Sequence, residues 1–369
     1  MVRRILFHAP SLAGGGAERV LVLMANEMAA RGHDVTLLVW NGQGPNADLL
    51  SPAVNLVDLY FPMRGDGFGK VKTLQGLART VRMLRSFRPD AVFSAPDFAN
   101  LIMAAALILA QSRARFFPGF HGAAALKSEK IGAILADRLT GFVAARATRA
   151  IAVSKGVGRD LVQNGYPPEK IAVIYNPLPP EGMGMPGPHP WLQALEAMGD
   201  GPVIGTLGRL VAVKDHATLL RAFAILRASR KARLVIFGEG PLEAETRALA
   251  TDLSIADDVL FAGYVNDPAA CYAAIDLLVL SSTSEGFGNV LIEAMAYGVP
   301  VVSTDAPHGP REILDDGRFG PLVPIADPAA LATQLQNSLE RPIDTEILRQ
   351  RADEFKINVI ADKYEGLFA

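Results

Sequence analysis

Short apolar runs alternate with helical patterns through the first half of the chain. Buried strands are predicted at residues 4–10 (RILFHAP), 34–40 (DVTLLVW), 91–96 (AVFSAP), 149–154 and 170–177. Residues 17–33 repeat apolar positions at helical spacing, and Gly32 ends that predicted helix. Strands that alternate with helices predict a parallel, doubly wound sheet with helices on both faces.

This rhythm stops at residues 177–190, which contain six prolines and three glycines, and then starts again. Further strands are predicted at residues 202–210, 233–241, 259–265, 277–282 and 299–304, with helices at 217–229 and 243–253. We therefore predict an α/β fold with two doubly wound, Rossmann-like domains, 1–178 and 191–355, joined by a linker at 179–190. Ligands of such sheets bind beyond the carboxyl ends of the strands, so both domains should offer loops to a cleft between them.

Composition agrees with a large packed core and a reducing compartment. The chain has 369 residues, of which 50% are hydrophobic, and a single cysteine. We expect Cys271 to be a packing residue. The most apolar run, residues 101–110, is about half of the roughly 20 residues that a spanning helix needs. We expect a core helix there and a cytoplasmic protein without a secretory leader.

Charge is divided unevenly along the chain. The net charge is −2, but residues 1–180 carry +9 and residues 181–369 carry −11. A helical segment at 67–89 concentrates basic residues, five of which are candidates for contact with a membrane or an acceptor: Lys70, Lys72, Arg79, Arg82 and Arg85. The simplest interpretation is a solvated helix face, whereas the +9 excess favours anionic lipid headgroups or a lipid pyrophosphate. No basic and aromatic interleaving supports a nucleic-acid partner.

The segment at 284–300, SEGFGNVLIEAMAYGVP, carries the most specific chemistry. Glu285 and Glu293 flank a glycine turn that follows a buried strand and opens a helix, for which Asn289 is the expected N-cap. Free amides at a helix start bind anions such as phosphate. Carboxylates instead suit vicinal hydroxyls. A phosphate with hydroxyl-bearing groups on both sides is a nucleotide sugar, so we expect Glu285 to hold the sugar and Glu293, about two turns into the helix, the ribose.

The diphosphate needs cations, and Arg209 and Lys214 follow a predicted strand of the same sheet. A surface salt bridge between Lys214 and Asp215 is the simplest alternative. The sequence has no D-x-D spacing and no His/Cys cluster with ligand spacing, so we expect catalysis without a metal.

Three glycines, Gly14, Gly15 and Gly16, separate a strand from a helix in the first domain. They allow close backbone approach, but Arg19 stands where a dinucleotide fingerprint needs its third glycine. Glu18 and Arg19 open the helix as capping charges or acceptor contacts, and the sequence does not separate these two. His121 lies in a loop between two glycines, where a surface position and a position at the cleft fit equally well.

The chain resembles the retaining glycosyltransferases of family 4, which have the GT-B fold. The resemblance rests on five motifs that occur in the expected order: GGGAER, GRLVAVKD, FGEGP, EGFGNVLIEAMA and DAPHGPREIL. The resemblance covers nearly the whole chain. The motifs GGGAER and GPREIL resemble those of one bacterial branch of the family, which builds surface polysaccharides and lipid-linked oligosaccharides. Relatives often have proline where Gly288 stands.

The resemblance implies a domain for the acceptor, a second domain for the donor and a C-terminal helix, about 356–369, that packs back on the first. It implies catalytic roles for Glu285, His121, Arg209 and Lys214. It also implies donor contacts from Gly15, Gly16, Arg209, Lys214, Gly263, Val265, Glu285, Gly286, Phe287, Gly288, Asn289, Val290 and Glu293.

The implied reaction moves a hexosyl or N-acetylhexosaminyl unit, with retention, from a UDP-sugar to a lipid-linked or polysaccharide acceptor. No cofactor is implied beyond the nucleotide-sugar co-substrate, and the protein would lie at the inner face of the plasma membrane. Two alternatives stay open: a nucleotide-sugar epimerase on the same fold, and a non-catalytic nucleotide-sugar-binding protein of the membrane surface.

Overall fold

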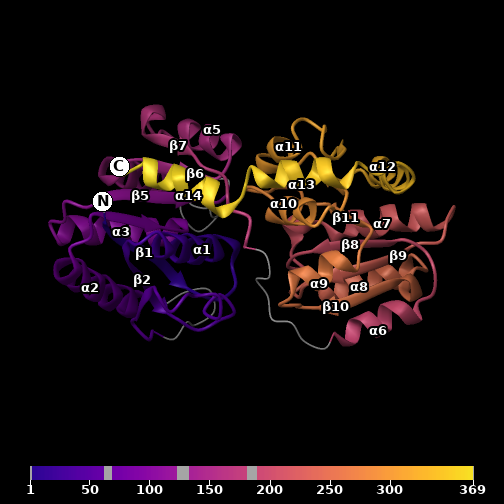
Figure 1. Ribbon diagram of the computed structural model, residues 1–369, viewed down its shortest axis with the longest axis horizontal. Helices are drawn as coiled ribbons and strands as arrows, with labels where there is room; N and C mark the ends of the chain where they lie inside the picture. Colours follow the sequence, from indigo (N-terminus) through magenta and orange to yellow (C-terminus); the bar gives the residue numbers. More distant parts are fainter. Residues whose placement is uncertain (1, 62–68, 123–132, 181–188, 369) are drawn as a thin grey trace. The chain divides into compact units, whose positions relative to one another are not determined.

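A computed structural model describes residues 2–61, 69–122, 133–180 and 189–368, apart from the side chains of Lys70 and residues 133–138. Contacts divide the chain into two compact units (Figure 1). Unit 1 comprises Met1–Pro177 and Ile357–Ala369, and unit 2 comprises Leu178–Lys356. Most of the predicted linker, residues 181–188, lies outside the described residues.

Unit 1 is a parallel sheet with the strand order β3-β2-β1-β4-β5-β6-β7. Its strands are β1 (Arg4–Ser11), β2 (Asp34–Asn41), β3 (Asn55–Asp58), β4 (Ala91–Ser94), β5 (Arg115–Phe120), β6 (Ala150–Ala152) and β7 (Ile171–Val173). Its helices are α1 (Gly16–Ala30), α2 (Lys70–Phe87), α3 (Asp97–Leu109), α4 (Ala133–Arg146), α5 (Lys155–Gln163) and α14 (Ile357–Gly366).

The C-terminal helix α14 completes the core of unit 1. Tyr364 and Phe368 pack against Phe93 of β4, with ring centroids 5.3 and 6.0 Å away. The Arg31 guanidinium, at the end of α1, donates to the carboxylates of Asp362 and Glu365 at 2.6 and 3.1 Å. Both apolar packing and ion pairs therefore attach this distant segment to the first unit.

Unit 2 is a second parallel sheet, with the order β10-β9-β8-β11-β12-β13. Its strands are β8 (Val203–Leu207), β9 (Arg233–Phe237), β10 (Val259–Gly263), β11 (Leu277–Leu280), β12 (Val301–Thr304) and β13 (Leu322–Val323). Its helices are α6 (Pro190–Ala197), α7 (His216–Arg227), α8 (Glu243–Asp252), α9 (Pro268–Ala273), α10 (Asn289–Ala296), α11 (Gly309–Ile313), α12 (Pro328–Glu340) and α13 (Thr345–Asp353).

The chain order of unit 2 reverses between its first strand, β8, and β11, which lies beside it. In a doubly wound sheet, the loops leaving the carboxyl ends of strands on either side of this switch point diverge and leave a ligand crevice. The switch point therefore brings together the loops that begin after Leu207 and after Leu280.

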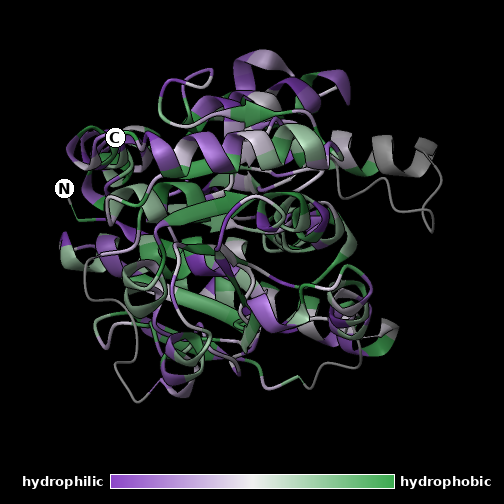
Figure 2. Cartoon of the chain, turned by 90° about the vertical axis from the view of Figure 1, so that its right-hand side faces the viewer, coloured by the Kyte–Doolittle hydropathy of each residue, from purple (hydrophilic) through white to green (hydrophobic). Residues whose placement is uncertain are grey.

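The strands that form the two sheets are mainly hydrophobic (Figure 2). All four residues of β11, for example, are at most 2% exposed, because helices cover both faces of a parallel sheet. The prediction of two doubly wound α/β domains is confirmed, and the cleft between them stays a prediction. Across the described ranges, no helix has both the length and the apolar character needed to cross a bilayer.

Candidate functional site

Lys214 and Glu285 meet at the switch point of unit 2. The Lys214 ammonium donates to Oε1 of Glu285 at 2.5 Å, and the two side chains are 25% and 11% exposed. Lys214 follows β8, whereas Glu285 follows β11. The sheet topology thus joins the cation and the carboxylate that the sequence predicts for this edge.

Hydroxyl side chains after β11 hold this pair in place. Ser282 Oγ donates to Oε1 of Glu285 at 2.6 Å, and Ser281 Oγ donates to the Lys214 carbonyl at 2.8 Å. Thr304, at the end of β12, donates to the Ser282 carbonyl at 2.6 Å. Neighbouring strand ends are therefore bonded to one another, so that both charged groups are fixed by the sheet rather than by a free loop.

Helix α10 begins directly after the glycine turn, and its N-cap is Gly288 rather than the predicted Asn289. Gly288 has a φ of +104°, which residues other than glycine rarely adopt. Asn289 is therefore the first helical residue. Phe287 is buried, and its ring centroid lies 5.7 Å from that of Phe355. The start of a helix favours anions through its dipole and its first backbone amides, so the start of α10 suits a phosphate.

Glu293 is the fifth residue of α10, about one turn from its start, so the predicted two turns were wrong. It is only 7% exposed, and its Oε2 accepts a hydrogen bond from Tyr272 Oη at 2.9 Å. The interpretation of Glu293 as a solvent-facing residue is therefore excluded. A buried carboxylate on a helix needs such a donor, since desolvation of an unpaired charge is costly.

Arg209 is exposed, and it follows β8 as predicted. The expected alternative for Lys214, a surface salt bridge with Asp215, is not what the structure shows. Asp215 caps helix α7, accepting from the amide and the hydroxyl of Thr218 at 3.1 and 2.6 Å. Lys214 is thus directed to Glu285.

The end of β10 supplies the last predicted donor residues in unit 2. Gly263 has φ +71°, and its carbonyl accepts from the amide of Gly238, which follows β9, at 2.7 Å. The Glu239 carboxylate accepts from the Tyr264 amide at 3.3 Å, and Val265 is partly exposed beyond it. The strand ends of β9 and β10 therefore form one continuous rim.

In unit 1, Gly15 is the N-cap of α1, and Glu18 folds back over it. A Cβ on Gly15 would lie 2.1 Å from Oε2 of Glu18, so the carboxylate rests directly on this glycine and would have to move to admit a side chain. Burial raises the pKa of Glu18, while its own backbone amide opposes the shift. This geometry favours the capping interpretation of Glu18 over acceptor contact.

His121 follows β5 and lies over Gly119, with Nε2 3.4 Å from where a Cβ of Gly119 would stand. Asn100 donates to the Gly119 carbonyl at 2.8 Å and accepts from Ser94 at 2.6 Å, which fixes this strand end. Desolvation lowers the pKa of His121 to about 4. The imidazole is therefore neutral, rather than a cation, at pH 7.

The basic residues of α2 divide into two groups. The Arg79 guanidinium lies 4.9 Å from the Phe61 ring centroid and donates to the Leu59 carbonyl, and Arg85 donates to the Leu109 carbonyl. These two arginines stabilise unit 1 itself. Lys72 is partly exposed and Arg82 is exposed, whereas the side chain of Lys70 lies outside the described part of the chain.

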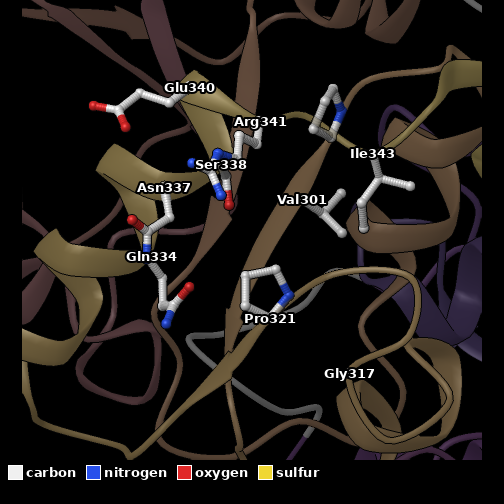
Figure 3. Close-up of a pocket in the computed structure, with 10 residues that line it drawn as sticks. Val301, Gly317, Pro321, Gln334, Asn337, Ser338, Glu340, Arg341 and Ile343 are labelled. Atoms are coloured by element: carbon white, nitrogen blue, oxygen red, sulfur yellow. The ribbon is translucent and has the colours of Figure 1, made fainter.

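A hollow of about 460 Å³ lies elsewhere in unit 2 (Figure 3). It is lined by Val301 and Pro321, at the amino ends of β12 and β13, and by Gln334, Asn337 and Ser338 of α12. Since Glu285 lies beyond the carboxyl ends of the strands, this hollow is at the opposite edge of the sheet and is separate from the site.

Several site residues escaped the sequence analysis: Ser281, Ser282, Thr304, Tyr272 and His308. The run Ser281–Ser284 directly before Glu285 was an available signal, because hydroxyls at a strand end commonly orient a neighbouring carboxylate. Tyr272 and His308 reach the site only through tertiary pairing. Cys271 is buried, and desolvation raises the pKa of its thiol to about 12, in agreement with a packing role.

Two family models and several relatives match the chain. Residues 14–181 match the model described as Glycosyltransferase Family 4, and residues 201–341 match that described as Glycosyl transferases group 1. The lipopolysaccharide core biosynthesis glycosyltransferase LpsE of Rhizobium meliloti is 29% identical over 363 residues, which cover 96% of either chain.

Two further relatives extend the comparison. The N-acetylgalactosamine-N,N'-diacetylbacillosaminyl-diphospho-undecaprenol 4-alpha-N-acetylgalactosaminyltransferase of Campylobacter jejuni is 38% identical over 190 residues, 51% of this chain and 49% of that one. The crystal structure of Anabaena HepE in complex with UDP and glucose superposes with a TM-score of 0.81 at 23% identity, covering 99% of this chain and 98% of that one, which shows the fold.

The two Rossmann-like domains and the two matching family models define a glycosyltransferase of the GT-B fold. The two family models together span most of the sequence. The chain belongs to glycosyltransferase family 4, as its motifs suggest.

Proposed function

We propose that the chain is a retaining, metal-independent glycosyltransferase. It transfers a hexosyl or N-acetylhexosaminyl unit from a UDP-sugar to a lipid-linked or polysaccharide acceptor in the synthesis of a cell-surface glycan. The Lys214–Glu285 pair beside the start of α10 carries this proposal, because it combines a phosphate cation with a hydroxyl acceptor at one switch point.

Each part of the donor has a matching group in unit 2. The rim at Gly263 and Val265 takes the nucleobase, and Glu293 takes the ribose hydroxyls. Arg209, Lys214 and the amides of Phe287, Gly288 and Asn289 take the diphosphate, with Gly286 and Val290 lining the turn. An ammonium has three donors, so Lys214 can hold Glu285 and a phosphate oxygen together. Glu285 is then left beside the sugar.

The reaction requires stabilisation of a departing diphosphate. The bond between C1 of the sugar and the β-phosphate oxygen breaks, and the acceptor oxygen bonds to C1 on the same face. The acceptor proton passes to the departing phosphate oxygen. Lys214, Arg209 and the dipole of α10 stabilise the developing charge, an effect worth about 10²–10³-fold in rate for one such donor.

Neither carboxylate is placed to act as a nucleophile. Glu285 is bonded to Lys214 and Ser282, and Glu293 is buried beside Tyr272. This arrangement supports same-face attack without a covalent intermediate. The unit 1 residues Gly15, Gly16 and the neutral His121 would serve the diphosphate and the reacting sugar, with the acceptor bound in the same unit.

The donor and acceptor classes rest on the relatives. HepE was crystallised with UDP and glucose, LpsE acts in lipopolysaccharide core biosynthesis, and the C. jejuni enzyme elongates a diphospho-undecaprenol substrate. These names favour a UDP-sugar and a lipid-linked or lipopolysaccharide acceptor for this chain. We place the protein on the cytoplasmic face of the plasma membrane, as a peripheral enzyme.

Helix α2 offers the surface for that membrane contact. Val71 and Leu74 are 68% and 67% exposed, and they lie one turn apart beside Lys72. Exposed aliphatic residues next to basic ones suit an anionic bilayer surface. Binding of Val71→Ser/Leu74→Ser to vesicles rich in phosphatidylglycerol should fall severalfold. The control is Ile225→Ser, which removes an aliphatic residue 49% exposed in unit 2, and equal binding by both variants would remove α2 from the contact.

The activity is tested with bacterial lipid extracts as acceptor and a panel of UDP-sugars as donors. We expect UDP release that depends on acceptor, persists in EDTA, and gives a product with the anomeric configuration of the donor by NMR. Isomerised UDP-sugar without UDP release would indicate the epimerase, and binding without any turnover would indicate the non-catalytic protein.

A further inference from the structure

His308 lies beside Glu285 and has an unusual backbone conformation. The two residues form an isolated parallel bridge, although they belong to different loops, after β11 and after β12. His308 has φ +81° and ψ −109°, a backbone conformation in which residues other than glycine are rarely found. A strained residue beside a functional carboxylate is a reason to look for a role of its side chain.

The segment that carries His308 is fixed directly onto the glycine turn. A Cβ on Gly309 would lie 1.8 Å from the Phe287 carbonyl oxygen, so the two backbones are in contact and only glycine fits. The Phe287 ring packs in turn on Phe355, at 5.7 Å between centroids. His308 therefore keeps its place relative to Glu285.

Arg351 of α13 holds the other end of this segment. Its guanidinium donates to the carbonyls of Glu312 and Ile313, at the end of α11, at 2.7 and 2.9 Å. It also lies 5.1 Å from the centroid of the Phe355 ring. Helices α10, α11 and α13 thus form one packed group around the turn (Figure 1). Such support over-determines the strained conformation at His308.

The order of the strands indicates which part of the donor His308 can reach. The rim proposed for the nucleobase lies at β10, the diphosphate cations follow β8, Glu285 follows β11, and His308 follows β12. Neighbouring strands lie about 4.8 Å apart, so His308 stands one strand beyond the sugar carboxylate, on the side away from the nucleotide.

We infer that His308 determines donor specificity by contacting the hydroxyl groups of the transferred sugar ring. An imidazole presents two ring nitrogens in a fixed plane for hydrogen bonds, and therefore distinguishes hydroxyls that differ in orientation. This inference rests on the proposed function and adds a residue that reads the sugar rather than the nucleotide. Strain is retained at His308 because the alternative, glycine, has no side chain to make the contact.

The test is His308→Gly, which removes the imidazole and relieves the backbone. The control is Ala326→Gly, which relieves a left-handed residue (φ +56°) at an exposed position after β13. Thermal stability and the affinities for UDP, UDP-glucose, UDP-galactose, UDP-GlcNAc and UDP-GalNAc are measured for both variants and the wild type.

We expect His308→Gly to be as stable as the wild type or more stable, with UDP affinity unchanged within twofold. Its preference among the four UDP-sugars should shrink by about tenfold, while Ala326→Gly keeps the wild-type preference. An unaltered preference in His308→Gly would overturn the inference alone. If the wild type binds neither UDP nor any of the sugars, the proposed function fails first, and the inference fails with it.

Discussion

The ammonium of Lys214 lies 2.5 Å from the carboxylate of Glu285, 71 residues further along the chain. This ion pair connects the two strands that flank the switch point of unit 2. It also gives the proposed phosphate cation and the proposed sugar carboxylate a fixed spacing. Changes at either residue should therefore alter stability and turnover separately.

Lys214→Met should lower kcat by about 10²–10³-fold, because one donor to the developing phosphate charge is lost. It should also lower the melting temperature, because Glu285 keeps Ser282 but loses its cation in a site that is only 11% exposed. The double variant Lys214→Met/Glu285→Gln should recover the stability and not the rate. An unchanged rate in Lys214→Met would remove this lysine from the site.

Tyr272→Phe should weaken nucleotide binding without unfolding unit 2. The hydroxyl donates to Glu293 at 2.9 Å, and a buried carboxylate that loses this donor is no longer held in place. We expect KM for the UDP-sugar to rise roughly tenfold, in line with a hydrogen bond to a charged group. Tyr297→Phe is the control, since its ring stacks on Tyr272 and the variant keeps the Tyr272–Glu293 bond. Equal KM values for both variants would contradict this role.

The sequence was informative where burial dictates the pattern. Strand β11 is apolar throughout and six of the eight residues of β1 are buried, because helices cover both faces of each sheet, and the site follows because it lies beyond the strand ends. The sequence therefore predicted that Lys214 and Glu285 follow strands at one edge of the sheet and that Glu293 lies in the helix after Glu285. The sequence did not predict the neighbours of the two glutamates, because Tyr272 and His308 approach them only when distant segments pack together.

Local conformation was also beyond prediction. Asn289 is a good N-cap by residue type, yet Gly288 takes that place because its φ of +104° lets the turn close. Arg79 and Arg85 have helical spacing typical of a solvated face, but their guanidinium groups bind carbonyls of neighbouring segments. The sequence shows which groups are present, and the tertiary contacts decide which of them are used internally.

Gly288→Ala should destabilise unit 2 by about 1 kcal/mol, which is the usual cost of a left-handed residue with a Cβ. The nearest side-chain atoms would lie 3.5 Å from the new methyl group, so crowding adds little. Chemical denaturation measures the change, with Gly366→Ala as the control, because a Cβ there meets nothing within 4 Å. Equal stability of the two variants would show that the turn accepts another conformation.

Stability should also decrease as the pH falls below about 6.5. Desolvation lowers the pKa of His8 to about 4, and His8 is bonded through Nδ1 to the Leu38 carbonyl at 3.0 Å. Folding lowers this pKa, so the stabilisation is present above pH 6.5 and is lost as the pH falls towards 4. Between pH 6.5 and 5 one such histidine contributes about 2 kcal/mol.

His8→Asn keeps an amide that can donate to Leu38 and removes the titration. Urea unfolding of unit 1 at pH 7 and pH 5 should show a smaller loss of stability in the variant than in the wild type. Parallel losses in the two proteins would mean that His8 is not responsible for the pH dependence.

Thermal stabilisation by UDP-, GDP- and ADP-sugars, with and without EDTA and beside Glu293→Ala, tests the central claim most directly. The account predicts a rise in melting temperature with UDP-sugars alone, unchanged by EDTA and reduced in Glu293→Ala. The absence of any rise, or a rise that EDTA abolishes and Glu293→Ala leaves intact, would contradict the donor site proposed for unit 2.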